Sequence, residues 1–148
     1  TNNLKPIGKE SNNGSKAKGI VKSSSTHLHI VDDDPIIRTL HSKLVQRVNR
    51  SLKITSSKDG KELIDFIELH QESHHLVLLD INMPRCDGWE VLDYLGNHSS
   101  RLSVRVIMVS SSTNDRDQQR AFKSPFVIDY ITKPLRLATV SRILKDFA

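Results

Sequence analysis

Polar side chains that could do chemistry lie at or near the ends of four short apolar runs in this chain. They comprise three carboxylates, one hydroxyl and one ammonium group: Asp32, Asp33, Asp80, Ser110 and Lys133. A carboxylate can act as a nucleophile or bind a divalent cation, and a hydroxyl and an ammonium group can hold the oxygens of a phosphoryl group. These residue types therefore indicate phosphoryl chemistry, provided that the fold brings them together.

Asp80 is the clearest candidate nucleophile. The apolar run 76–79 is too short for a helix core and is bounded by polar residues, so it predicts a strand that is buried on both faces. Asp80 follows at the carboxyl end of that strand, where open α/β sheets place their chemistry. Pro84 and Asp87-Gly88 predict a turn after it. Taken alone, the segment would better suit an aspartate that only caps the turn.

The elements that must position these side chains alternate along the chain. Short apolar runs between turn residues predict strands at 28–31, 52–55, 76–79, 104–109 and 126–131. Helical spacing of apolar residues, with Asp34 before Pro35 as a start signal, predicts helices at 35–49, 61–70, 89–95 and 137–147. We expect a weak, polar helix at 114–122, which Ser124-Pro125 ends. Five strand–helix repeats predict an α/β fold, with a parallel sheet, helices on both faces and right-handed crossovers.

The carboxyl ends of parallel strands share one edge of a sheet, so the five polar side chains should meet there. Three converging carboxylates repel one another unless a divalent cation neutralises them, and an all-oxygen ligand set suits Mg²⁺. Ser110 and Lys133 could then hold the oxygens of a phosphoryl group on Asp80.

Four motifs make residues 27–148 resemble the receiver domain of two-component response regulators, of the chemotaxis-regulator-like, single-domain kind. The motifs are Val-Asp-Asp-Asp-Pro at 31–35, Leu-Asp-Ile-Asn-Met-Pro at 79–84 with Asp-Gly at 87–88, Val-Ser-Ser at 109–111, and Tyr-Ile-Thr-Lys-Pro at 130–134. The resemblance implies a flavodoxin-like, doubly wound, five-stranded parallel sheet with strand order 2-1-3-4-5. It also implies a phosphorelay in which a sensor histidine kinase or a histidine phosphotransfer protein supplies the phosphoryl group.

The resemblance further implies a role for each residue of the site. Asp80 would accept the phosphoryl group from a phosphohistidine. Asp33, Asp80 and the backbone carbonyl of Asn82 would ligate Mg²⁺, and Asp32 would act through a bound water. Such a domain is not a classical enzyme, although it catalyses its own phosphorylation and dephosphorylation.

Ser110, Lys133 and Tyr130 complete the implied machinery. Ser110 and Lys133 would grip the phosphoryl oxygens, and the Lys133-Pro134 bond resembles the cis peptide of the family. Ser110 and Tyr130 would form a switch that alters the face made by the fourth helix, the fifth strand and the fifth helix. Ser110 stands where Thr is commoner, which keeps the hydroxyl group.

Two other functions fit part of the pattern. A phosphatase of the haloacid dehalogenase type also places an aspartate nucleophile after a strand. It needs a second aspartate two residues on as a general acid, and Asn82 occupies that position here. A degenerate receiver that serves only as a docking module would have lost an acceptor or acid-pocket residue, and none is lost.

Composition separates a tail from the predicted domain. Residues 1–26 are rich in Ser, Asn, Gly and Lys, so we expect a flexible basic tail or linker. Their five lysines and one glutamate account for +4 of the net charge of +5. Because the rest is almost neutral, a nucleic-acid-binding function is not indicated.

The chain shows no sign of a membrane or secretory segment. No apolar run approaches the roughly 20 residues of a membrane span, and the start lacks the apolar core of a secretory signal. A single cysteine, Cys86, suits a reducing compartment, so we expect a soluble cytoplasmic protein. No output domain follows the last predicted helix. The chain is therefore expected to be a free-standing regulator or the receiver part of a hybrid kinase.

Several histidines lie close enough in sequence to suggest a metal site. His70, His74 and His75 lie close in sequence but lack a neighbouring carboxylate or thiolate cluster, so we interpret them as surface residues. His27 and His29 share one face of the first predicted strand, and the sequence assigns them no chemistry.

Overall fold

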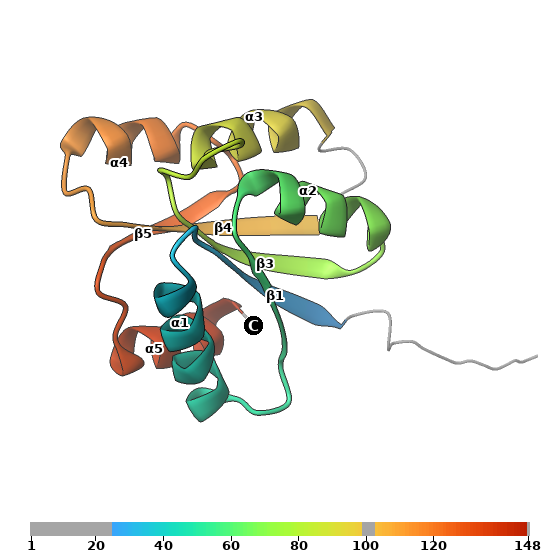
Figure 1. Ribbon diagram of the computed structural model, residues 1–148, viewed down its shortest axis with the longest axis vertical. Coiled ribbons are helices and arrows are strands. Elements are labelled where there is room, and N and C mark those ends of the chain that lie inside the picture. Colours follow the sequence, from blue (N-terminus) through green and yellow to red (C-terminus); the bar gives the residue numbers. More distant parts are fainter. Residues whose placement is uncertain (1–24, 99–102, 148) are drawn as a thin grey trace, which may run out of the picture.

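The structure, a computed structural model, describes residues 25–98 and 103–147 (Figure 1). In chain order its elements are β1 (Thr26–Val31), α1 (Pro35–Val48), β2 (Lys53–Ser57), α2 (Gly60–Leu69), β3 (His74–Leu79), α3 (Gly88–His98), β4 (Ser103–Ser110), α4 (Asp115–Phe122), β5 (Val127–Thr132) and α5 (Leu137–Phe147). All ten predicted elements are present, and their ends differ from the predicted ones by at most three residues.

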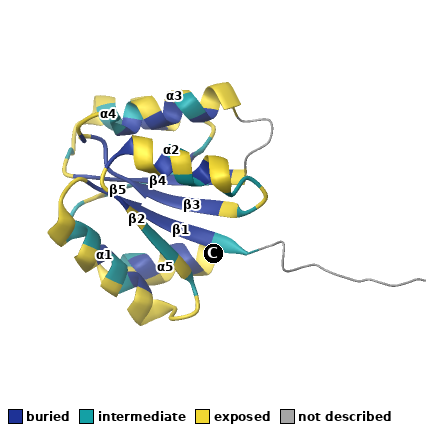
Figure 2. Cartoon of the chain, turned by 45° about the vertical axis from the view of Figure 1, so that its right-hand side comes forward, coloured by how far each residue is buried: buried dark blue, intermediate teal, exposed yellow. Residues whose placement is uncertain are grey.

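The strands form one parallel sheet in the order β2-β1-β3-β4-β5. Helices α1 and α5 cover one face, and α2, α3 and α4 cover the other (Figure 1). This confirms the flavodoxin-like, doubly wound sheet that the resemblance implied. Figure 2 shows the strands buried between helices whose outer faces are exposed.

Strand register decides which residues reach the functional edge together. Val31 of β1 pairs with Leu79 of β3, and Leu79 pairs with Met108 of β4. The last residues of each strand before this line are apolar and buried, so the residues that follow leave the core at the carboxyl edge of the sheet. Asp32 and Asp80 therefore begin their loops side by side.

Side-chain caps start the helices that flank this edge. Asp34 accepts a hydrogen bond from the backbone N–H of Ile36, which confirms it as the N-cap of α1, with Pro35 at the first helical position. Asp59 caps α2 by accepting from the backbone N–H of Glu62. The Glu62 side chain accepts from the backbone N–H of Lys58, the residue before the cap, so a second backbone donor at this helix start is bonded.

Two predictions, one about Thr26 and one about His75, are wrong. Strand β1 begins at Thr26, which the sequence placed in the tail, because β1 continues to pair with β3 as far as His74. His75 is not a surface residue: it is 1% exposed, since it lies in the middle strand of the sheet on a face that α2 covers. His74, its neighbour, is exposed as predicted.

The predicted tail lies outside the described residues, apart from Ser25 and Thr26. Within 25–98 and 103–147, no helix has the length and apolar character needed to cross a membrane.

Candidate functional site

Asp80 is held rigidly at the carboxyl end of β3. Its backbone N–H donates to the carbonyl of Val31 (3.0 Å), which continues the β1–β3 pairing by one residue. Its side-chain Oδ1 accepts from the backbone N–H of Ile81 (2.9 Å), and the residue is only 8% exposed. The carboxylate is therefore fixed in orientation and mostly withdrawn from water.

Two further carboxylates from the β1–α1 loop join Asp80. One oxygen each from Asp32, Asp33 and Asp80 lies within 4.8 Å of the others. Asp32 is buried, and its Oδ1 accepts from the backbone N–H of Asp34 (2.9 Å). Asp33 is exposed, so the cluster is open to solvent on that side.

Lys133, just after β5, supplies the counter-charge. Its Nζ lies 2.6 Å from Oδ2 of Asp32 and 3.5 Å from Oδ1 of Asp80. Its backbone N–H donates to the carbonyl of Ser110 (2.8 Å), which ties the ends of β4 and β5 together. The peptide bond between Lys133 and Pro134 is cis, as the resemblance implied.

The charges of this edge perturb one another. Burial is the main cause that raises the pKa of Asp80, the Asp32 carboxylate adds to the rise and the Lys133 ammonium opposes it, and the resulting pKa is about 6. Burial alone would lower the pKa of Lys133, but its hydrogen bond to Asp32 and the charge of Asp80 outweigh burial and raise that pKa. Lys133 is therefore a cation, and keeping the Asp80 carboxylate ionised destabilises the folded state.

Ser110 and Tyr130 are connected through one loop residue, Ser112. Ser110 is 1% exposed, and its Oγ accepts from the backbone N–H of Ser112 (3.1 Å). The carbonyl of Ser112 accepts from the hydroxyl of the half-buried Tyr130 (3.0 Å). The Ser112 hydroxyl donates to Asp117 of α4 (2.7 Å). A chain of hydrogen bonds thus runs from the end of β4 to β5 and α4.

Residues 28–145 match the family described as the response regulator receiver domain. The chain belongs to this family. The match favours a receiver domain over a phosphatase of the haloacid dehalogenase type.

Named relatives and solved structures agree with this assignment. The probable methanogenesis regulatory protein FilR2 of Methanothrix harundinacea (strain 6Ac) is 30% identical over 128 residues, which cover 77% of this chain and 82% of FilR2. The two-component response regulator ARR22 of Arabidopsis thaliana is 27% identical over 126 residues, covering 84% of this chain and 86% of ARR22. A two component response regulator from Cytophaga hutchinsonii superposes with a TM-score of 0.73 at 26% identity, covering 83% of this chain and 96% of that one.

The loop after β3 of this receiver domain contains contacts that the sequence did not predict. Arg85 has a positive φ of 69°, and its Nε donates to Oδ2 of the buried Asp59 (2.8 Å). The backbone N–H of Gly60 donates to the carbonyl of Cys86 (2.9 Å). The loop is therefore pinned to the start of α2. An Arg and an Asp 26 residues apart give no local signal, so only the tertiary structure could reveal this pair.

Gly88 is needed where this loop returns to the sheet. A Cβ on Gly88 would lie 2.6 Å from the carbonyl oxygen of Asp80 and 3.0 Å from Cα of Ile81. Its backbone N–H donates to the carbonyl of Ile81 (2.8 Å). The Asp-Gly pair that predicted a turn therefore also lets α3 start directly against the backbone of the nucleophile candidate.

The acidic cluster has a donor set that fits Mg²⁺. The cluster would offer the ion carboxylate oxygens only. Its exposed side, at Asp33, leaves room for the waters that Mg²⁺ keeps. The pKa of Asp80 is raised despite Lys133, so a further positive charge would be favoured here. Asn82 is exposed in the loop two residues after Asp80, so its backbone carbonyl could be a further ligand.

Proposed function

We propose that Asp80 accepts a phosphoryl group from a phosphohistidine of a histidine kinase or a histidine phosphotransfer protein. One observation supports this most strongly: a nearly buried carboxylate lies at the carboxyl edge of the sheet, between two other carboxylates and an ammonium group 3.5 Å away. A carboxylate that served only to cap a turn would not need these neighbours.

In the proposed reaction, a carboxylate oxygen of Asp80 attacks the phosphorus atom. A phosphorus–oxygen bond forms and the phosphorus–nitrogen bond breaks. The electron pair of that bond stays with the imidazole, which takes up a proton from solvent. Oδ1 already accepts from the N–H of Ile81, so we assign the attack to Oδ2.

Charge placement explains how the site would favour this step. Lys133 lies close enough to both Asp32 and Asp80 to move onto a phosphoryl oxygen, and the Ser110 hydroxyl would donate to another. Mg²⁺, held by Asp33, Asp80 and the carbonyl of Asn82, would neutralise charge on the phosphoryl oxygens. Asp32 would contribute through a water bound to the ion.

A small phosphodonor tests this proposal without the partner protein. The protein is incubated with phosphoramidate, with Mg²⁺ or with EDTA, and uptake is followed by intact-protein mass. We expect one phosphoryl group per chain, only with Mg²⁺, and none in Asp80→Asn. The control Asp93→Asn, an exposed carboxylate of α3, should behave like the wild type.

The outcomes separate the alternatives. Uptake by Asp80→Asn at the wild-type rate would show that the acceptor is another residue. No uptake by the wild type under any condition would favour a receiver that serves only as a docking module.

We place the phosphodonor protein on the exposed face of α1. That helix starts beside the acidic cluster, and the donor must cover this edge to bring its phosphohistidine to Asp80. Ile36 is 75% exposed and Leu40 is 47% exposed, and both line a shallow groove on α1. Apolar residues next to a reaction centre suit a partner that must bind and leave.

Matched substitutions test this docking face. Ile36→Ser should slow transfer from a phosphorylated histidine phosphotransfer domain at least several-fold but leave phosphorylation by phosphoramidate unchanged. Leu69→Ser is the control, because Leu69 is 78% exposed at the carboxyl end of α2. Equal effects of the two changes would contradict this placement.

We propose the cytoplasm as the location of the protein, since the single cysteine suits a reducing compartment.

Phosphorylation would be read out through Ser112. At rest, the Ser110 hydroxyl oxygen accepts from the backbone N–H of Ser112. When this hydroxyl turns to donate to the phosphoryl group, its oxygen moves away from that N–H and the bond weakens. Ser112 also holds Tyr130 and Asp117, so its movement would affect β5 and α4 together. Helix α4 buries only Ala121, so a modest free energy can shift it.

Backbone NMR with and without beryllofluoride, a phosphoryl mimic, tests this switch. In the wild type, shift changes should extend from the loops around Asp80 to residues 114–130. In Ser110→Ala they should stay near Asp80. Tyr130→Phe, which removes only the hydroxyl bond to Ser112, should keep the phosphorylation rate and alter the response of α4. Wild-type changes confined to the Asp80 loops would contradict the switch.

A further inference from the structure

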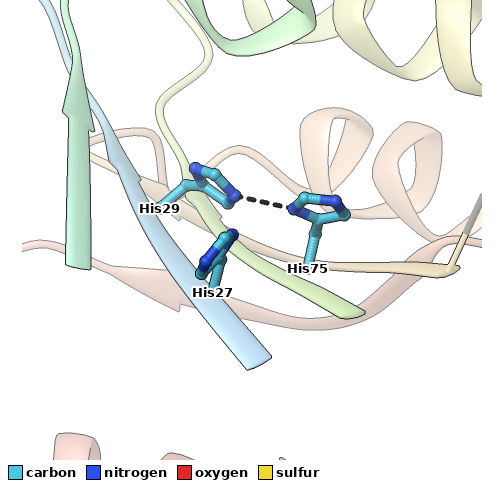
Figure 3. A group of neighbouring side chains, drawn as sticks. All are labelled: His27, His29 and His75. Atoms are coloured by element: carbon cyan, nitrogen blue, oxygen red, sulfur yellow. Dashed lines mark hydrogen bonds between the residues drawn. The ribbon is translucent and has the colours of Figure 1, made fainter. Parts of the chain in front are cut away.

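A second cluster of possible metal ligands lies at the other end of the sheet. His27 and His29 are two residues apart in β1 and lie on the same face, and His75 of β3 pairs directly with His27 in the register (Figure 3). His27 is five residues before Asp32, and at about 3.3 Å per residue the cluster is roughly 16 Å from the acidic site. The two sites are therefore separate.

The three rings converge closely enough for one ion. One nitrogen of each histidine lies within 4.8 Å of the others, and Nε2 of His29 is 2.9 Å from Nδ1 of His75. Two nitrogens bound to Zn²⁺ at 2.0–2.1 Å in a tetrahedron are about 3.3 Å apart. The distance between the His29 and His75 nitrogens would therefore need to grow by only about half an ångström for both to bind the ion.

Hydrogen bonds set the tautomer that ligation requires in His75. Its Nε2 lies 2.8 Å from the carbonyl oxygen of His70, which can only accept, so Nε2 carries the proton. Its Nδ1 is then a free lone pair that faces His29. A histidine whose second nitrogen donates to a backbone carbonyl is the usual arrangement of a metal ligand, because that bond fixes the ring.

The other two rings have nitrogens with unmet bonding capacity. With Nδ1 of His75 accepting, Nε2 of His29 donates, which leaves Nδ1 of His29 as a buried acceptor. Within the described residues, neither this atom nor Nδ1 of His27 has a hydrogen-bond partner. Such burial usually costs about 1–3 kcal/mol per group. An aliphatic side chain would fill the same space without that cost, so packing alone does not account for three histidines here.

Electrostatics keep the cluster in its ligating form. Burial, together with the charge that the neighbouring histidines could carry, lowers the pKa of His29 to about 3. Burial is also the largest cause that lowers the pKa values of His27 and His75. All three rings are therefore neutral near pH 7, as metal ligation by imidazole requires.

We propose that His27, His29 and His75 bind a borderline transition-metal ion such as Zn²⁺ at the amino-terminal end of β1 and β3. Neutral imidazoles without carboxylates select such ions over Mg²⁺ or Ca²⁺. On binding, the proton on Nε2 of His29 moves to its Nδ1, so the ion replaces the hydrogen bond between His29 and His75 and no net proton is lost.

His70 lies next to the open coordination position. Its Nδ1 is 2.9 Å from the carbonyl of Phe66, so Nδ1 carries the proton and Nε2 is a free lone pair. Its ring centroid is 5.6 Å from that of His27, and both it and the adjoining end of α2 are partly exposed. His70 or a water would provide the fourth ligand, and the ion would enter from this side.

Zinc titration of the protein without a histidine tag tests the proposal. A competition assay against a chromophoric zinc chelator should give one ion per chain. The result should be the same in excess Mg²⁺ and in the Asp80→Asn variant. Co²⁺ should give the visible absorption of a tetrahedral nitrogen site. At a hundredfold excess of free Zn²⁺ over its dissociation constant, the melting temperature should rise by roughly 10 °C.

His27→Phe provides the decisive variant. It keeps an aromatic ring against Phe66, whose centroid is 5.5 Å from that of His27, and removes only the ligand nitrogens. We expect at least a tenfold loss of zinc affinity with little change in the melting temperature of the metal-free protein. His74→Phe is the matched control, because His74 is exposed and bonds Ser103 (2.7 Å) outside the cluster.

Three results would overturn the proposal. They are the absence of stoichiometric zinc binding, equal losses in His27→Phe and His74→Phe, and a Co²⁺ spectrum that remains octahedral. In each case the three histidines would serve as an aromatic packing cluster around Phe66. A His75→Gln variant, tested by the same titration, keeps the proposal falsifiable if His27→Phe does not fold.

Discussion

Asp80→Asn should raise the free energy of unfolding of the metal-free protein while it abolishes phosphorylation. Burial of the Asp80 carboxylate raises its pKa from an ordinary value of 3.8 to about 6. The difference corresponds to about 3 kcal/mol of unfavourable free energy when the folded protein carries this charge at pH 7. Asparagine is uncharged, has almost the same volume, and can still accept the backbone N–H of Ile81 at Oδ1.

The sign of the pH dependence follows from the raised pKa. The folded state keeps the Asp80 proton up to about pH 6, whereas the unfolded chain releases it near pH 3.8. This protonation stabilises the wild type fully below the lower value, and the stabilisation is lost as the pH rises through the higher one. The advantage of Asp80→Asn should therefore be small near pH 4, grow between pH 4 and 6, and stay constant above that range.

Urea unfolding in EDTA at several pH values measures this difference directly. At pH 7.5 the midpoint of Asp80→Asn should exceed that of the wild type, and Asp93→Asn should match the wild type. Mg²⁺ should then stabilise the wild type and leave Asp80→Asn nearly unchanged, which narrows the gap. A variant that is no more stable than the wild type at pH 7.5, or equally more stable at pH 4.5, would refute the electrostatic account of Asp80.

Further substitutions at this edge and in α3 give separate tests. Lys133→Gln should lower the free energy of unfolding in EDTA by about 3 kcal/mol, since it leaves the buried Asp32 without its cation, and Mg²⁺ should restore part of that loss in a urea titration. Asp33→Ala should weaken Mg²⁺ binding more than Asp32→Ala, because only Asp33 is proposed as a direct ligand; equal losses in a Mg²⁺ titration would contradict that distinction. Gly88→Ala should destabilise the fold by about 1–3 kcal/mol, because its Cβ would meet backbone at 2.6 Å. Gly96→Ala in α3, where a Cβ meets nothing within 4 Å, should instead stabilise it by about 0.5–1 kcal/mol, as urea midpoints would show.

The fold and the acidic edge were predictable because each signal is local. A strand such as 76–79 is a continuous apolar run that ends in its functional residue, so the position of Asp80 follows from its neighbours in sequence. The topology of a parallel sheet then brings the strand ends together without any knowledge of individual contacts. Asp34-Pro35 predicted the start of α1 for the same reason, since an N-cap depends on two or three adjacent residues.

The connection from Ser110 to Tyr130 could not be predicted in the same way. Ser111 and Ser112 are alike in sequence, and only the path of the loop makes Ser112 the residue that bonds both Ser110 and Tyr130. The pair of Arg85 and Asp59 depends on a backbone conformation, with φ of 69° at Arg85, that no residue type at this position requires. Contacts of this kind arise from tertiary geometry rather than from local pattern.

The histidine cluster lies between these two cases, because the sequence contained its signal in a form that needed the register. Asp32 and Asp80 both follow the last residues of neighbouring parallel strands, so counting back from them aligns β1 with β3. His27 is five residues before Asp32, and His75 is five residues before Asp80, so the count places the two histidines side by side. His29, two residues along β1, must share their face. The same alignment that brings the carboxylates together at one end of the sheet therefore brings the imidazoles together at the other.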